Sequence, residues 1–192
     1  PEGKKPETWQ EVQHTALEKV TGIGEDGLHR LWVSSAESFN GAFYYDLDND
    51  SWAREERDGF KDHPIRRIVR DRGGELWFLS KETNPTGGYT IYRSSLSTSY
   101  ELAPVRVGHG PVNDLARTQD EVLWLATDDG LLEGTLEGES FHLEKRYTDR
   151  DGLLSIQVWA VTEGPDGTIW VCYPSSGAGV TRFKGGEARS YE

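Results

Sequence analysis

The sequence predicts an all-β chain built from four copies of one structural repeat. Four tryptophans stand 45, 47 and 46 residues apart, each between two large apolar residues. They are Trp32, Trp77, Trp124 and Trp170. A period of roughly 40 to 50 residues is the length of one four-stranded blade of a β-propeller. We therefore predict a single β-propeller region over residues 1–192, with four blades of four antiparallel strands and the repeated tryptophans packed between blades.

The other strands follow from residues that keep a fixed distance from each tryptophan. Aliphatic residues lie nine and twelve positions before it, Ile23 and Val20 in the first copy, and indicate a first strand. A turn rich in Asp and Gly precedes the tryptophan strand, and a glycine begins the third strand after it. A short polar and aromatic stretch closes each copy as the fourth strand. The blades are predicted at about 16–56, 60–104, 107–147 and 152–192.

The beginning of the chain holds a further strand-like segment. Residues 8–12, Thr-Trp-Gln-Glu-Val, resemble the fourth strand of an earlier unit, which predicts a partial blade at 6–13. Four blades could close alone, but this pattern favours a section of a larger ring of seven or eight blades. An open section leaves sheet edges exposed, so we expect further blades or a second copy of the chain to complete it.

Composition excludes two classes of partner. The net charge of −12 and the pI of about 4.9 disfavour nucleic acid, whose phosphates the surface would repel. The longest apolar run is far shorter than the roughly 20 residues that a membrane-spanning helix needs. The single cysteine, Cys172, has no partner for an internal disulfide and is expected to be a small buried side chain.

The fourth copy carries a more specific pattern. It has a Gly-Leu loop at 152–153, an aliphatic strand ending in Glu163, an Asp-Gly turn at 166–167, the strand around Trp170, and a glycine followed by Arg182 and Phe183. This copy resembles the two-component regulator propeller repeat family. Copies one to three match at their first and tryptophan strands and depart elsewhere, for example at Arg70 and Arg117, which replace the acid.

The resemblance implies a function as well as a fold. Such repeats form extracytoplasmic sensor regions of membrane histidine kinases and hybrid regulators, often for oligosaccharides. We therefore expect a non-catalytic module that recognises a small molecule, an oligosaccharide or another protein, outside the cytoplasm. The segment from Gly164 to Trp170 is also similar to streptogramin B lyase, so a propeller lyase or lactonase is one alternative. A protein-binding scaffold is another.

Candidate ligand-binding residues lie in the first strands. In a propeller the first strand of each blade lines the central channel, so its middle residues face a ligand there. These residues are Arg66, Arg67, Asn113, Asp114 and Trp159. Arginine and asparagine suit acidic groups and sugar hydroxyls, and an exposed indole suits a sugar face. No catalytic residue and no cofactor are predicted.

Metal-binding patterns are incomplete. Residues 46–50 open like a calcium-binding loop, but Ser51 and Arg57 occupy the positions that require Gly and Glu, so a tight turn is expected there. The five histidines have no ligand spacing, and no metal site is predicted. His63 and His109 precede equivalent first strands. A metal held by them or by Asp114 would favour an enzyme, whereas an aromatic groove at Trp159 would favour a sugar sensor.

Overall fold

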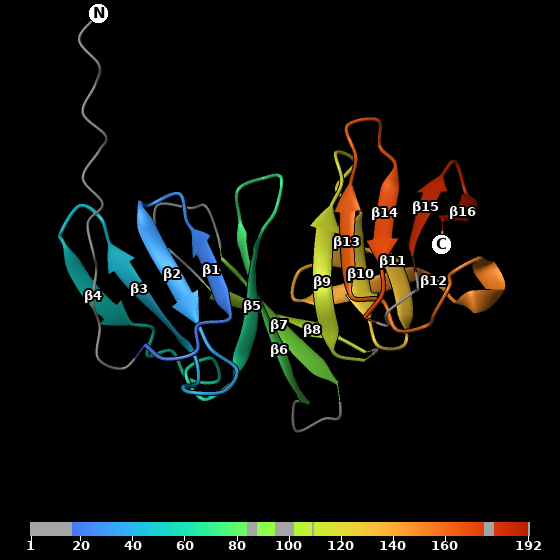
Figure 1. Ribbon diagram of the computed structural model, residues 1–192. Helices are drawn as coiled ribbons and strands as arrows, with labels where there is room; N and C mark the ends of the chain where they lie inside the picture. Colours follow the sequence, from blue (N-terminus) through green and yellow to red (C-terminus); the bar gives the residue numbers. More distant parts are fainter. Residues whose placement is uncertain (1–16, 84–87, 95–101, 109, 175–178, 192) are drawn as a thin grey trace, which may run out of the picture.

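A computed structural model describes residues 17–83, 88–94, 102–108, 110–174 and 179–191, and shows four successive four-stranded units (Figure 1). Each unit is an antiparallel meander in which neighbouring strands pair in chain order. This architecture confirms the predicted all-β propeller fold. The partial blade predicted at 6–13 lies outside the described residues.

The strands of the first two blades follow the repeat closely. The first blade contains β1 (Gly22–Glu25), β2 (Arg30–Ser34), β3 (Ala42–Asp46) and β4 (Ser51–Arg54). The second contains β5 (Ile65–Arg70), β6 (Leu76–Thr83), β7 (Tyr89–Ser94) and β8 (Leu102–Val107).

The third and fourth blades repeat the same order. The third contains β9 (Val112–Arg117), β10 (Leu123–Thr127), β11 (Gly130–Glu137) and β12 (Ser140–Tyr147). A short 3-10 helix, η1 (Asp149–Asp151), leads into the fourth. That blade contains β13 (Ala160–Glu163), β14 (Ile169–Cys172), β15 (Val180–Lys184) and β16 (Glu187–Tyr191).

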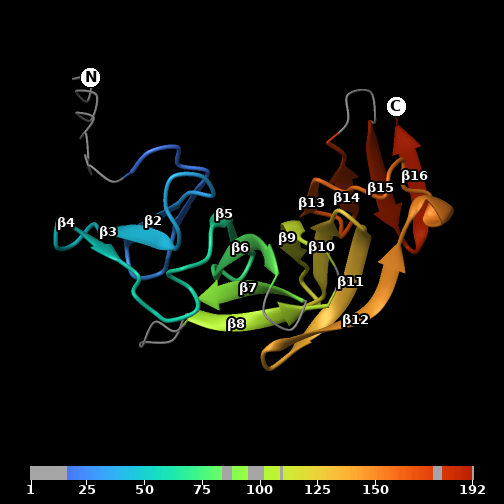
Figure 2. The same cartoon turned by 90° about the horizontal axis from the view of Figure 1, so that it is seen from below.

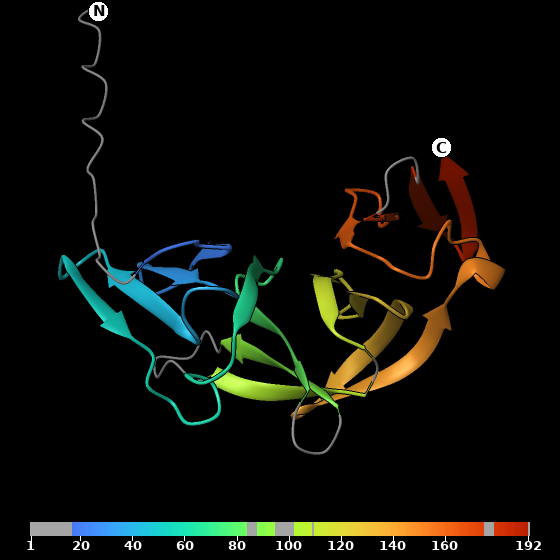
Figure 3. The same ribbon diagram turned by 60° about the horizontal axis from the view of Figure 1, so that its bottom comes forward.

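The four blades follow one another along an arc, with the first and last at its two ends (Figure 3). The inner strand of each blade contacts that of the next, so β1, β5, β9 and β13 form the concave side. On the outer side β8 and β12 meet, and Ser140 pairs with Arg106 in parallel register (Figure 2). The backbone N–H of Arg106 donates to the Glu139 carbonyl at 2.9 Å. The second and third blades are therefore joined at both edges.

Three of the repeated tryptophans are buried between blades. Trp32 packs in a cluster with Ile65 and Phe78 of the second blade. Trp77 packs in the same way against the third blade, and Trp124 against the fourth. Trp170 is only partly buried, and no fifth blade follows it among the described residues. The tryptophan face of each blade is thus the face that receives the next one.

The structure shortens two predicted first strands. In the first blade β1 begins at Gly22, so Val20 precedes it. The sequence places Val158 and Trp159 in the first strand of the fourth blade, whereas β13 begins at Ala160. The Val158 N–H instead donates to the Thr127 carbonyl of the third blade at 2.9 Å, which ties the segment to its neighbour before the sheet begins. Trp159 therefore lies immediately before β13 and is 45% exposed.

The acidic segment at 46–50 forms the expected turn. Asp46 ends β3, and its Oδ1 accepts hydrogen bonds from the backbone N–H groups of Asp48 and Asn49, both at 3.0 Å. These bonds replace the backbone pairing that ends with the strand. The carboxylate thus holds the turn between β3 and β4 together.

Candidate functional site

The predicted ligand-binding residues meet where the inner strands of three blades converge. Arg66 Nη2 on β5 donates to Asn113 Oδ1 on β9 at 2.8 Å. The Arg66 guanidinium also lies over the Trp159 indole, 5.2 Å from the ring centroid. This stacking is a cation–π contact between the second and fourth blades. Arg66 Nη1 is buried and has no hydrogen-bond partner.

Asn113, in the third blade, connects Arg66 of the second blade to the segment that leads into the fourth. Its Nδ2 donates to Asp128 Oδ1 at 2.7 Å and to the Val158 carbonyl at 2.8 Å. The side chain is 2% exposed, so these bonds form away from water. Because its amide donors and its carbonyl oxygen are all engaged, Asn113 holds the site together and has little left for a ligand.

Arg67 and Asp114 form a second pair beside the first. Arg67 Nη2 lies 3.4 Å from Asp114 Oδ1, and Asp114 Oδ2 accepts from the Val161 N–H at 3.1 Å. Burial raises the pKa of Asp114, and the charge of Arg67 opposes that rise. Burial lowers the pKa of Arg66, and the neighbouring charge of Arg67 adds to the effect. The site therefore contains charges that are only partly compensated.

A cavity of about 660 Å³ opens beside the Arg67–Asp114 pair. Arg67 and Asp114 line it, whereas Arg66, Asn113 and Trp159 lie outside its wall. The charged residues around it are Arg67, Arg70, Arg72, Arg117, Asp71, Asp114 and Glu163. Trp170, Cys172 and Val180 of the last blade contribute its less polar side. The cavity thus has four arginines against three carboxylates, in a chain whose net charge is −12.

Three of these arginines were not predicted as site residues. Arg70 ends β5 and is exposed, and its side chain has no hydrogen bond or ion pair among the described residues. Arg72 Nη1 reaches Glu163 Oε2 across the cavity at 3.2 Å. The sequence signal was present for Arg70 and Arg117, which stand where the repeat pattern has an acid. The repeat pattern alone does not show that these two arginines line a cavity.

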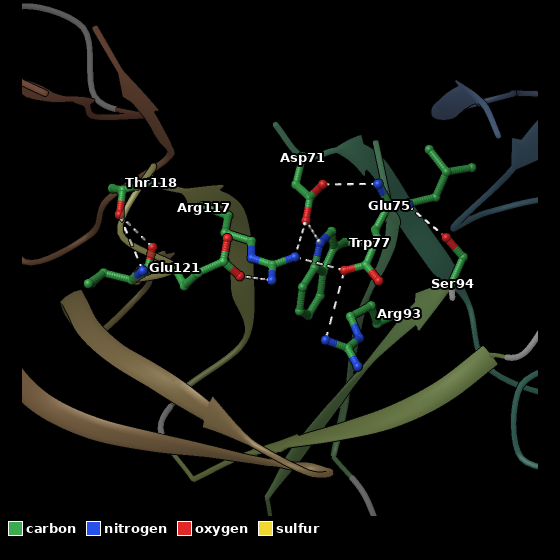
Figure 4. A network of polar contacts seen from close by, with 10 residues as sticks. Asp71, Glu75, Trp77, Arg93, Ser94, Arg117, Thr118 and Glu121 are labelled. Atoms are coloured by element: carbon green, nitrogen blue, oxygen red, sulfur yellow. Dashed lines mark hydrogen bonds and ion pairs between the residues drawn. The ribbon is translucent and has the colours of Figure 1, made fainter. Parts of the chain in front are cut away.

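Arg117 is held by a network between the second and third blades (Figure 4). Its Nη1 donates to Glu75 Oε2 at 2.9 Å and to Asp71 Oδ2 at 3.3 Å, and its Nη2 contacts Glu121. Glu75 also lies 3.8 Å from Arg93 Nη1. Arg117 is thus committed to neighbouring carboxylates, whereas Arg67 has one ion pair at 3.4 Å and the Arg70 side chain has none among the described residues.

No histidine among the described residues lines the cavity. His63 Nδ1 lies 3.4 Å from Glu82 Oε2, and its ring contacts Tyr92. His109 lies outside the described residues. Within the part of the chain that the structure describes, no three His, Cys, Asp or Glu side chains group as metal ligands would.

Neither the family models nor the curated proteins contain a match to this chain. Solved structures do match. The extracellular domain of the proposed hybrid two-component system BT4673 from B. thetaiotaomicron is 15% identical, with a TM-score of 0.66, over 90% of this chain and 25% of that one. A catalytically inactive variant of virginiamycin B lyase from Staphylococcus aureus with quinupristin is 17% identical, with a TM-score of 0.64, over 90% and 55%.

A third similar structure is YCF48 bound to D1 peptide, at 12% identity and a TM-score of 0.55 over 89% of this chain and 52% of that one. The chain therefore spans between a quarter and about half of the length of these proteins. The three functions differ, so the likeness establishes the propeller fold and leaves function to the site. No helix within the described residues is long and apolar enough to span a membrane.

Proposed function

We propose that this chain is a non-catalytic recognition module whose concave side binds an acidic ligand, an oligosaccharide that carries carboxylate or sulfate groups. The observation that carries the proposal is the cavity of about 660 Å³ with four arginines in its wall. Its size falls in the range of ligand pockets, roughly 300 to 1,000 Å³. The planar guanidinium presents paired donors that match carboxylate and sulfate oxygens.

The charge distribution supports an anionic ligand over a neutral one. Most of the chain is acidic, yet arginines outnumber carboxylates around this cavity. Arg70 has no partner among the described residues, and Arg67 meets Asp114 only at 3.4 Å. An arriving anion therefore needs to displace no strong ion pair at these two residues.

A sensing role outside the cytoplasm fits this binding mode. Extracellular domains of proposed two-component systems are among the similar structures, and the repeat pattern of the fourth blade resembles the same class. In this proposal the concave side detects the ligand and a partner or an attached signalling domain carries the response. The lyase likeness supports the enzyme alternative, and the experiment below separates the two.

The test is a panel of oligosaccharides presented to the purified chain. Uronic-acid and sulfated disaccharides should raise its melting temperature, because a ligand that binds only the folded state stabilises it. Neutral disaccharides of the same length should not. Mass spectrometry of each ligand after incubation should show unchanged masses. A new product mass would instead establish the lyase or lactonase alternative.

Substitution of Arg70 locates the binding. Loss of a charge-assisted hydrogen bond costs about 1.5 to 3 kcal/mol, so Arg70→Gln should weaken binding by roughly 10- to 100-fold. Arg106→Gln is the matched control, since Arg106 is exposed on the outer strand β8 and outside the cavity. Equal weakening by both variants would mean general charge attraction and no site at the cavity.

A further inference from the structure

The first blade exposes residues that are buried in every other blade. Val20 and Ile23 lie twelve and nine positions before Trp32 and are 45% and 63% exposed. The equivalent residues of the second blade, Ile65 and Ile68, are 0% and 7% exposed because the first blade covers them. The corresponding residues of the third and fourth blades are buried too. We call this surface of the first blade, with Val20 and Ile23, the Ile23 face. Its side chains are of the kind that another blade covers elsewhere in the chain.

The last blade exposes the opposite half of the same interface. Val180 lies opposite Cys172 on the neighbouring strand, as Ala42 lies opposite Ser34 in the first blade. Ala42 is fully buried against the second blade, whereas Val180 is 37% exposed. Trp170 beside it is likewise less buried than Trp32. Trp170 and Cys172 of β14 and Val180 of β15 form the Trp170 face.

The two faces match each other because the chain contains their combination three times. Inside the chain, each tryptophan face packs against the aliphatic first strand of the following blade, and these contacts form the three buried clusters. The Trp170 face of one molecule therefore has the same kind of apolar partner in the Ile23 face of another. Burial of both apolar faces against each other removes them from water, and this stabilises the contact.

We propose that two copies of this chain join head to tail, so that the Trp170 face of each covers the Ile23 face of the other. Such a pair holds eight blades, within the usual range of four to eight for propellers. A head-to-tail contact that closes on itself gives a defined ring and leaves no face exposed. The arc of the single chain, with its two faces at opposite ends, is the shape that this requires (Figure 3).

The pairing also affects the cavity. Trp170, Cys172 and Val180 belong both to the Trp170 face and to the wall of the cavity. The first blade of the second copy would therefore lie beside the arginines of the first copy and close the less polar side of that wall. The inference goes beyond ligand recognition, because it assigns a partner to the Ile23 face, which lies outside the cavity wall.

Sedimentation equilibrium of the purified chain tests the pairing. We expect a concentration-dependent species of two copies. Ile23→Asp and Trp170→Asp should each raise the dissociation constant at least tenfold, because each places a charge in both contacts of the pair. Leu47→Asp is the matched control, since Leu47 is 50% exposed on a turn outside both faces. Circular dichroism would confirm that all three variants fold.

A mixing experiment distinguishes head-to-tail pairing from any other dimer. A mixture of Ile23→Asp chains with Trp170→Asp chains has one intact contact per pair and should recover two-copy species. A pair of one wild-type chain and one double-variant chain has no intact contact and should not form, so a labelled double variant should stay monomeric when wild type is added. The proposal would be overturned by a chain that stays monomeric up to about 100 times the concentration used in the ligand-binding experiments. It would also be overturned by a dimer whose dissociation constant neither substitution changes.

Discussion

Asp71 Oδ2 accepts a hydrogen bond from the Trp77 indole Nε1 at 2.9 Å, in the buried layer between the second and third blades. The same relationship joins Asp26 and Trp32 at 2.7 Å, again six residues apart. The aspartate of the turn thus fixes the tryptophan that receives the next blade. In the second blade it also accepts from Arg117, so one carboxylate connects the packing layer to the cavity wall.

Replacement of Asp71 should therefore weaken the fold. Asp71→Ala leaves the indole N–H of Trp77 buried without an acceptor, which costs about 1 to 3 kcal/mol of unfolding free energy. Urea denaturation followed by tryptophan fluorescence would measure the loss. Asp48→Ala, in an exposed turn, should leave the free energy of unfolding within about 0.5 kcal/mol of wild type. Equal midpoints for the two variants would refute the role of Asp71.

The repeated tryptophans should differ in their contribution to stability. Trp77→Ala removes a side chain that is 1% exposed and should cost about 3 to 5 kcal/mol. Trp170→Ala removes a partly exposed one and should cost clearly less in dilute monomer. Thermal denaturation of both variants at low concentration checks this order. Equal losses would show that Trp170 is as tightly packed as the others.

In the third blade the backbone of β12 lies so close to Gly134 that a side chain there has no room. A Cβ on Gly134 would collide with the backbone carbonyl of His142, at a register shift between β11 and β12. Gly134→Ala should therefore destabilise the fold by more than about 1 kcal/mol. Gly108→Ala, where nothing lies within 4 Å, is the control. Urea midpoints compare the two, and an unaffected Gly134 variant would contradict this packing.

The raised pKa of Asp114 gives stability a pH dependence. Burial favours the neutral acid, so this carboxyl contributes stability that is fully present below its ordinary pKa of 3.8 and lost as the pH rises through the higher folded value. Asp114→Asn lacks that component. The unfolding free energy of wild type minus that of Asp114→Asn should therefore fall as the pH rises above about 4. A difference that rises with pH would mean that Arg67 lowers the pKa of Asp114.

The repeat made the architecture predictable, because the spacing of the four tryptophans fixes where each blade packs on the next. It also indicated that Arg66 and Asn113 would lie on inner strands, whereas Trp159, predicted on the same kind of strand, lies just before β13. Their contacts were not predictable, since Arg66 and Trp159 come from blades 93 residues apart and meet only through the arc. Three of the four cavity arginines, Arg70, Arg72 and Arg117, were not predicted for the same reason. Arg72 lines the cavity opposite Glu163 of the fourth blade, and the sequence does not show that these two residues meet.

The most direct test of ligand recognition is a calorimetric titration of the chain with a uronic-acid disaccharide, in parallel with the double variant Arg67→Gln/Arg70→Gln. We expect saturable binding to wild type at low salt, weakened at least tenfold in the double variant and reduced further as salt is added. Binding that is equally tight in both proteins, or absent in wild type for every acidic disaccharide of the panel, would contradict it.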